Sequence, residues 1–177
     1  MKKILIGDGG MGSELRFRGV EVPSHIESIW SALALTTNTK EIKEIHLDYI
    51  EAGAQYITAN NYTVTRPILE RANMADQLED LTLLSISIAK EAIKESGKDI
   101  QLATSLPPLE TSYRADLVLD RSMLEDQYAE MVGIIEGKTD IIICETMAHS
   151  QEAEIALESI QNSNSKKWLS WTLHGNR

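Results

Sequence analysis

The stretch DIIICETMAHSQEAEIAL, residues 140–157, decides the fold class of this 177-residue chain. It begins with a nearly unbroken apolar run at residues 140–144, as expected for a strand that is covered on both faces in a parallel sheet. A helical pattern then covers residues 150–161. A strand that leads into a helix is the unit from which alternating α/β folds are built.

The same alternation extends outward from this stretch along the chain. The apolar runs predict strands at residues 3–6, 55–59, 100–105, 140–144 and 168–173. Helical spacing predicts helices at residues 39–52, from Pro67 towards Gly97, from an N-cap at Ser122 to about residue 136, and at 150–161. This order implies a parallel sheet with right-handed crossovers.

Two architectures fit this pattern: an open doubly wound sheet, and part of a (β/α)8 barrel of the TIM type. A complete barrel has eight strands and takes about 250 residues, so about five of its eight β/α units are visible here. Because no linker or repeat interrupts the pattern, we expect residues 1–177 to form a single domain.

The composition argues against several kinds of partner. The formal net charge is −10 and no basic run is present, which disfavours nucleic acid and anionic membranes. No apolar run approaches the roughly 18 residues needed to span a membrane. The only cysteine, Cys144, cannot form an internal disulfide and is expected to be buried and structural. These features predict a cytoplasmic protein. His46, beside Asp48 on a predicted helix, is expected at the surface or hydrogen-bonded.

The segment GDGGMGSEL contains Gly7-x-Gly9-x-x-Gly12, the letters of a dinucleotide-binding turn. That motif requires a second strand within a unit of about 30 residues and an acid about 20 residues further on. Here the second strand begins near Gln55, and Asp8 would repel a pyrophosphate. We therefore interpret Asp8 as a functional group at the carboxyl end of the first strand, where barrel enzymes collect their chemistry.

Polar groups follow each predicted strand, at the edge of the sheet where parallel strands end. They are Asp8, Gly9 and Gly10 after the first strand; Thr58, Asn60, Asn61 and Tyr62 after the second; Ser105 after the third; Glu145 and Thr146 after the fourth; and Thr172, His174 and Asn176 after the fifth. The two acids would neutralise an ammonium group, and the glycine amides would approach a carboxylate. This combination predicts an amino acid as the ligand.

Four segments in this order, DGGMGSEL, HLDYIEAGAQYITANNYT, SLPPLETSY and DIIICETMAHSQEAEIAL, together with IWSALAL, resemble the homocysteine S-methyltransferase family along nearly the whole chain. The resemblance implies a (β/α)8 barrel that transfers a methyl group from a small donor to the thiol of homocysteine and gives methionine. It also implies zinc as the cofactor that binds and activates the thiolate.

Carried over to this sequence, the resemblance gives substrate-binding roles to six positions: Asp8, Gly9, Gly10, Asn60, Tyr62 and Glu145. It implies that the backbone of Gly9 and Gly10, after the acid Asp8, contacts the amino-acid part of homocysteine. It implies that Glu145 holds the ammonium group. Asn60 and Tyr62 match the polar end of the second strand, although Ala-Asn-Asn-Tyr stands here where the family usually has Thr-Asn-Thr-Tyr.

The zinc ligands that the resemblance implies are cysteines after the sixth strand and in a Gly-Gly-Cys-Cys element after the eighth. Neither has a counterpart up to Arg177, and Cys144 does not match a ligand position. We therefore expect a chain truncated before its zinc cysteines, without a metal site or catalytic residues of its own and inactive by itself. Five strands cannot close a barrel, so an exposed sheet edge would be open to association with another copy or a second chain.

Two rival functions stay open. The chain is a catalytically inactive fragment or binding protein of the same fold, or it is an open-sheet α/β enzyme that binds a nucleotide. Stoichiometric zinc with methylation of homocysteine would argue against the first, and tight binding of NAD or FAD would favour the second. The residues do not choose among S-methylmethionine, S-adenosylmethionine, a betaine-like compound and a folate-loaded partner as methyl donor.

Overall fold

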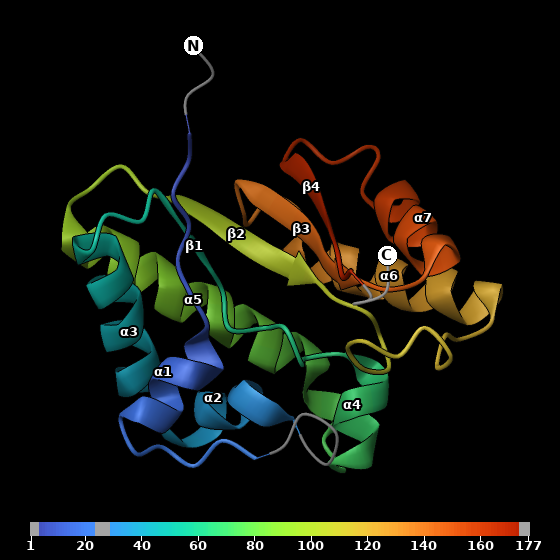
Figure 1. Ribbon diagram of the computed structural model, residues 1–177, viewed down its shortest axis with the longest axis horizontal. Helices are drawn as coiled ribbons and strands as arrows, with labels where there is room; N and C mark the ends of the chain where they lie inside the picture. Colours follow the sequence, from blue (N-terminus) through green and yellow to red (C-terminus); the bar gives the residue numbers. More distant parts are fainter. Residues whose placement is uncertain (1–3, 24–28, 174–177) are drawn as a thin grey trace.

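The computed structural model describes residues 4–23 and 29–173, and its strands form one parallel sheet (Figure 1). The strands are β1 Tyr56–Thr58, β2 Gln101–Leu106, β3 Ile141–Met147 and β4 Lys166–Trp171, in the order β1-β2-β3-β4. The α-helices are α1 Met11–Phe17, α2 Ala34–Thr37, α3 Thr39–Glu51, α4 Arg66–Arg71, α5 Leu78–Ser96, α6 Arg121–Ile135 and α7 Ser150–Ser159. Two short 3₁₀ helices are η1 Trp30–Leu33 and η2 Ala75–Gln77. The described chain is therefore an α/β fold with a parallel sheet.

The strand order and the curl of the sheet fit part of a barrel better than a doubly wound sheet. Each strand pairs with the next one along the chain, whereas the order in a doubly wound sheet reverses at a switch point. The rings of Tyr56 on β1 and Trp168 on β4 meet edge to face with centroids 4.9 Å apart, although β2 and β3 lie between them. A flat sheet would separate β1 from β4 by about 14 Å. The sheet is therefore curled toward the face that carries these rings.

The other face of the sheet packs against α5, α6 and α7, which lie along it in Figure 1. Alternate strand residues point this way, as the period of two in a strand requires. They join helix residues in one buried cluster, whose members include Ile57, Leu102, Ile142, Cys144, Ala89, Tyr128 and Ala156. Cys144 is fully buried there, and burial raises the pKa of its thiol to about 12. The prediction of a structural cysteine is confirmed.

The strand predicted at residues 3–6 does not form in residues 4–6, and residue 3 lies outside the described residues. An isolated bridge between Gly7 and Tyr56, a hydrogen bond from the Gln55 N–H to the Ile6 carbonyl (2.7 Å) and one from the Ile6 N–H to the Gln55 side-chain oxygen (3.2 Å) connect this segment to the start of β1. Ile4 is 83% exposed and Ile6 is 58% exposed. In the described structure this segment pairs on one side only, so its apolar side chains are not covered and its pairing stays incomplete.

The predicted helix at residues 39–52 is confirmed to within one residue by α3, and Gly53 follows it with φ 108°, which favours glycine. The helical region predicted between Pro67 and Gly97 is interrupted. α4 ends at Arg71, Asn73 follows with a left-handed φ of 56°, and α5 begins at Leu78. Ser122 lies inside α6, and Asp120 occupies the N-cap position instead, so the predicted cap at Ser122 is wrong. In the described part of the chain, no helix combines the length and apolar character that a membrane crossing requires.

The structure also corrects the expectation for His46. Its side chain in α3 is fully buried, and neither ring nitrogen has a hydrogen-bond partner. Burial lowers the pKa of its imidazole to about 4, because the charged form would lose its hydration. The neighbouring positions Ile42 and Ile45 belong to the second buried cluster of the chain. His46 is therefore a neutral packing residue, neither exposed nor hydrogen-bonded.

Candidate functional site

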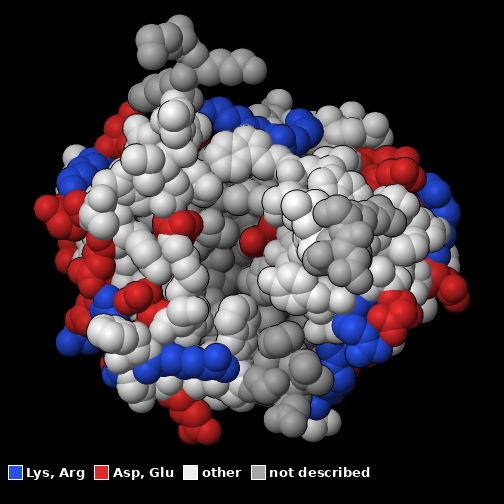
Figure 2. Space-filling view, in the orientation of Figure 1, with Lys and Arg blue, Asp and Glu red and all other residues white. Residues whose placement is uncertain are grey.

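The carboxyl ends of the strands surround one cavity of about 830 Å³ on the curled face of the sheet. Figure 2 shows a hollow in the middle of this side of the molecule, with acidic side chains at two of its walls. Each strand contributes polar residues to the lining, as do the glycine turn and the loop after β2. The lining includes Asp8, Gly9, Gly10, Trp30, Thr58, Asn60, Tyr62, Ser105, Ser112, Tyr113, Glu145, Thr146 and Ser170.

Asp8 lies where the N-terminal segment meets the end of β1. Its Oδ2 accepts a hydrogen bond from the backbone N–H of Thr58 (2.6 Å), and its Oδ1 accepts one from the Thr58 hydroxyl (3.2 Å). Burial raises the pKa of Asp8 to about 6, although the bonds from Thr58 act in the opposite direction. The carboxylate therefore fastens the first turn to β1 and also faces the cavity.

Glu145 reaches the same cavity from β3. Its Oε1 accepts a hydrogen bond from the Ser105 hydroxyl on β2. Burial raises the pKa of Glu145, and the nearby charge of Asp8 raises it further. The next residue, Thr146, has φ 60° and lies where the register of β3 shifts against β4. Such an irregularity re-aims the side chains around it, and here it coincides with the placement of Glu145 in the cavity wall.

The charges of the cavity are not balanced. Its described lining contains two carboxylates, Asp8 and Glu145, and no lysine or arginine. Both carboxylates are desolvated, which makes their attraction for a cation stronger than it would be in water. The cavity is therefore suited to a small ligand with a positive group, as the sequence predicted for the ammonium of an amino acid.

The glycines of the first turn provide space for aromatic rings. A Cβ atom on Gly7 would lie 2.3 Å from the ring of Tyr56, and one on Gly12 would lie 2.7 Å from the ring of Trp30. A Cβ on Gly9 would lie 2.7 Å from the Tyr49 hydroxyl. The letters of the dinucleotide motif are thus accounted for by packing.

Gly9 and Gly10 both line the cavity, where the sequence placed them. Unlike Gly7, Gly9 and Gly12, Gly10 has room for a side chain, since the nearest atom to a Cβ there, the Ser13 hydroxyl, would lie 3.4 Å away. Their contact with a ligand carboxylate stays a prediction.

Asn60 is at the cavity wall, but its amide is engaged with Ser31. The Asn60 Oδ1 accepts a hydrogen bond from the Ser31 hydroxyl, and its Nδ2 donates to the Ser31 carbonyl, both at 2.8 Å. Tyr62 also lines the cavity, with its hydroxyl 2.6 Å from the Ser112 hydroxyl and its ring edge-on to Trp30. Burial raises the pKa of Tyr62 to about 12. Ligand contacts from Asn60 and Tyr62 stay predictions.

Three cavity residues have left-handed backbone conformations that non-glycine residues rarely adopt: Trp30 (φ 44°), Tyr113 (φ 63°) and Thr146 (φ 60°). Strained residues of this kind gather at ligand sites. No periodic pattern in the sequence marks them, and the hydroxyls of Ser31, Ser112 and Ser170 were missed for the same reason. His174 and Asn176, predicted at this rim, lie outside the described residues.

The described residues do not fit a zinc centre. No group of three or more histidine, cysteine, aspartate or glutamate side chains lies close enough to hold a metal ion within residues 4–23 and 29–173. Cys144 faces the helices, and its raised pKa keeps the thiol protonated. A thiolate-rich zinc site therefore cannot be built from this part of the chain.

The fold and the cavity define an α/β protein with a ligand-binding cavity that is lined by acidic residues and lies at the carboxyl ends of parallel strands. A family model described as homocysteine S-methyltransferase matches residues 5–177. The chain therefore belongs to the homocysteine S-methyltransferase family, as the sequence motifs indicated.

Curated relatives and solved structures agree with this assignment. The homocysteine S-methyltransferase of Escherichia coli K12 is 28% identical over 186 residues, which cover 96% of this chain and 59% of that protein. Homocysteine S-methyltransferase 3 of Zea mays is 29% identical over 94% of this chain and 55% of its own length. The crystal structure of the homocysteine methyltransferase MmuM from Escherichia coli, metallated form, matches with a TM-score of 0.83 at 26% identity, over 98% of this chain and 64% of that one. The chain thus spans a little over half the length of these curated relatives.

Proposed function

We propose that this chain binds homocysteine at the strand ends, as the amino-acid-binding part of a homocysteine S-methyltransferase. The observation that carries the proposal is the pair of buried carboxylates, Asp8 and Glu145, which face one cavity whose described lining holds no cation. In this proposal Glu145 and Asp8 hold the ammonium group, and the backbone of Gly9 and Gly10 receives the carboxylate. Tyr62 lies beside the bound amino acid, and Asn60 supports the wall.

The chemistry of the whole reaction would join the homocysteine sulfur to the methyl carbon of a small donor as the donor's bond to that carbon breaks, which gives methionine. Zinc in such an enzyme stabilises the thiolate. Because the described residues of this chain do not form a zinc centre, we assign them no step in thiol activation. Their part is to bind and orient the amino acid, which supports catalysis through proximity. We expect homocysteine binding without methyl transfer by this chain alone.

Two observations support a wider proposal about the architecture. The unreversed strand order and the curl measured at Tyr56 and Trp168 favour a single (β/α)8-type domain over residues 1–177, with further strands needed for closure. β4 is the last strand of the described sheet, and its outer edge is where we expect a strand from another copy of this chain, or from a second chain, to pair.

The buried free thiol of Cys144 suits a reducing compartment such as the cytoplasm.

Titration calorimetry with L-homocysteine tests the binding proposal. Glu145→Gln removes the charge and keeps the shape, and it should weaken binding by about 10- to 100-fold, as expected for loss of a charged hydrogen bond. The matched control is Glu130→Gln on α6, whose exposed carboxylate pairs with Arg66 away from the cavity lining. It should bind as the parent protein does.

A ligand control separates ammonium recognition from other contacts. The analogue 4-sulfanylbutanoic acid lacks the amino group and should bind far more weakly than homocysteine. Equal binding of the two compounds, or unchanged binding in Glu145→Gln, would overturn the proposal. Stoichiometric zinc in the purified protein together with methylated product would instead favour a catalytic chain over a binding protein.

A further inference from the structure

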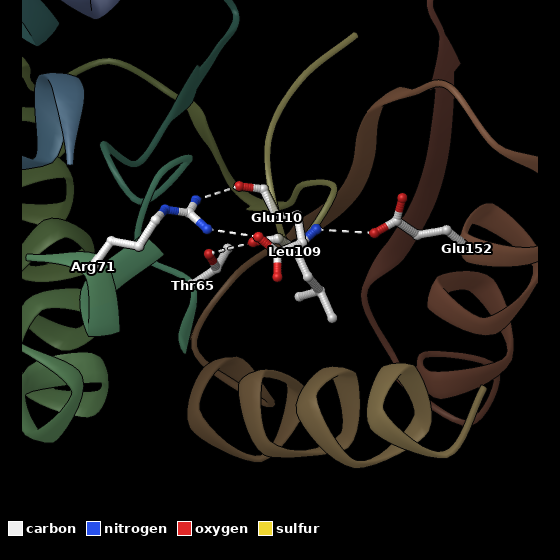
Figure 3. Close-up of polar contacts among 5 residues, drawn as sticks. All are labelled: Thr65, Arg71, Leu109, Glu110 and Glu152. Carbon is white, nitrogen blue, oxygen red and sulfur yellow. Dashed lines mark hydrogen bonds and ion pairs between the residues drawn. The ribbon is translucent and has the colours of Figure 1, made fainter. Parts of the chain in front are cut away.

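The loop that follows β2 is held at two residues by groups from α4 and α7 (Figure 3). The Leu109 N–H donates to Glu152 Oε1 on α7 (2.9 Å), and the Leu109 carbonyl accepts from the Thr65 hydroxyl at the start of α4 (2.7 Å). Arg71, at the end of α4, donates to the Glu110 carboxylate (2.6 Å) and to the Glu110 carbonyl (2.5 Å). We call this set of contacts the loop anchor.

The loop anchor is mostly inside the protein. Leu109 and Thr65 are fully buried, and Glu152 is nearly so. A carboxylate at such a depth needs partners to compensate its lost hydration, and Glu152 has the Leu109 N–H and, more distantly, the Tyr128 hydroxyl (3.4 Å). The anchor therefore depends on specific polar contacts in addition to the apolar packing of Leu109.

The next residues of the same loop form part of the cavity. Ser112 follows Glu110 by two residues, and its hydroxyl lies 2.6 Å from the hydroxyl of Tyr62. Tyr113 lines the cavity with a left-handed φ of 63° and is 65% exposed. One residue spans at most about 3.5 Å, so Ser112, two residues beyond Glu110, stays within about 7 Å of it while the loop anchor holds Glu110.

We propose that Thr65 and Glu152 are positioning residues for ligand binding: through the loop anchor they hold Ser112 against Tyr62 and Tyr113 over the cavity. Neither residue lines the cavity, so their effect on affinity is transmitted by the backbone of the loop. The inference rests on the proposed function in one respect, that L-homocysteine is the binding probe.

Variants of Thr65 make the test specific. Thr65→Val removes the hydroxyl and keeps the shape, while Thr65→Ser keeps the hydroxyl and serves as the rescue. Thr139→Val is the matched control, because the Thr139 hydroxyl also donates to a backbone carbonyl, that of Leu102 (2.8 Å), but at the opposite end of the sheet. Glu152→Gln keeps an acceptor for the Leu109 N–H and should behave like the parent protein, whereas Glu152→Leu should behave like Thr65→Val.

Two measurements are needed: the Kd of L-homocysteine, and amide hydrogen exchange of residues 109–114 without ligand. Thr65→Val is expected to raise the Kd about tenfold and to speed exchange in this segment, with Thr65→Ser and Thr139→Val unchanged in both. An unchanged Kd in Thr65→Val, or an equal rise in Thr139→Val, would overturn the inference. If the parent protein fails to bind homocysteine, the proposed function is wrong, and amide hydrogen exchange alone tests the loop anchor. Faster exchange of residues 109–114 in Thr65→Val but not in Thr139→Val supports the anchor. Exchange in Thr65→Val equal to that of the parent protein overturns it.

Discussion

The substitution Asp8→Asn should stabilise the protein at neutral pH, because the charged form of this buried carboxylate is costly. Burial raises its pKa from the ordinary 3.8 to about 6. Each pH unit of such a difference corresponds to about 1.4 kcal/mol, so ionised Asp8 lowers the free energy of unfolding by about 3 kcal/mol above pH 6. Asparagine resembles the protonated acid and retains an acceptor for the Thr58 N–H.

The sign of the effect fixes its pH dependence. A group whose pKa is raised by folding contributes stability that is fully present below its unfolded pKa and is lost as pH rises through its folded pKa. The difference in unfolding free energy between Asp8→Asn and the parent should therefore grow by about 3 kcal/mol between about pH 4 and pH 7. The contribution of His46 is common to both proteins and cancels in the difference.

Urea unfolding at several pH values measures this difference. Any loss from weaker bonds to Thr58 is the same at every pH, so the slope with pH carries the information. Asp126→Asn, at an exposed position on α6, is the matched control and should change stability by less than about 0.5 kcal/mol. A difference between Asp8→Asn and the parent that stays flat from acid to neutral pH would refute the reasoning. The stabilised variant should also bind homocysteine less well, since stability and ligand affinity conflict at this residue.

Two further predictions concern the glycines and the buried His46. Gly12→Ala should destabilise the protein by about 1–3 kcal/mol, because the added Cβ meets the ring of Trp30. Gly133→Ala in α6 should stabilise the protein by up to about 1 kcal/mol, because its added Cβ points into open space. Urea unfolding measures both changes, and two changes of the same sign would contradict this prediction. A second prediction concerns His46: the free energy of unfolding of the parent protein minus that of His46→Leu should fall as pH drops from 6.5 towards 4, because unfolded His46 binds a proton that folded His46 does not. The opposing contribution of Asp8 is common to both proteins and cancels in this difference. A difference that stays flat over this pH range in urea unfolding would contradict the prediction.

Elements with a strong internal pattern could be predicted from the sequence. The helical spacing of residues 39–52 and the apolar run of residues 140–144 are local patterns, and α3 and β3 appear where these patterns place them. Residues 4–6 are equally apolar but do not form a strand, because strand pairing depends on a neighbour that a local pattern does not contain. The break at Asn73 was missed because one left-handed residue ends a helix without changing the composition around it.

The site was predictable to the extent that it follows from topology. Asp8 and Glu145 were placed at one edge because parallel strands end together, and both line the cavity. The hydrogen bonds between Asn60 and Ser31 were not predictable, since Ser31 lies in the short 3₁₀ helix η1, which no periodicity in the sequence marks. The same holds for Ser112 and the loop anchor, which join segments 43 and 44 residues apart in sequence.

The close approach of aromatic rings to the first turn has a consequence for sequence variation in this part of the molecule. Gly12 is confined by Trp30, Gly9 by Tyr49 and Gly7 by Tyr56. Each glycine and its ring therefore form a coupled pair, in which a smaller partner would free the glycine position to accept a side chain. Related chains that lose one of these rings should tolerate alanine at the matching glycine, and the spacing of the turn would then stop resembling a nucleotide motif while the acid between the glycines stayed in place.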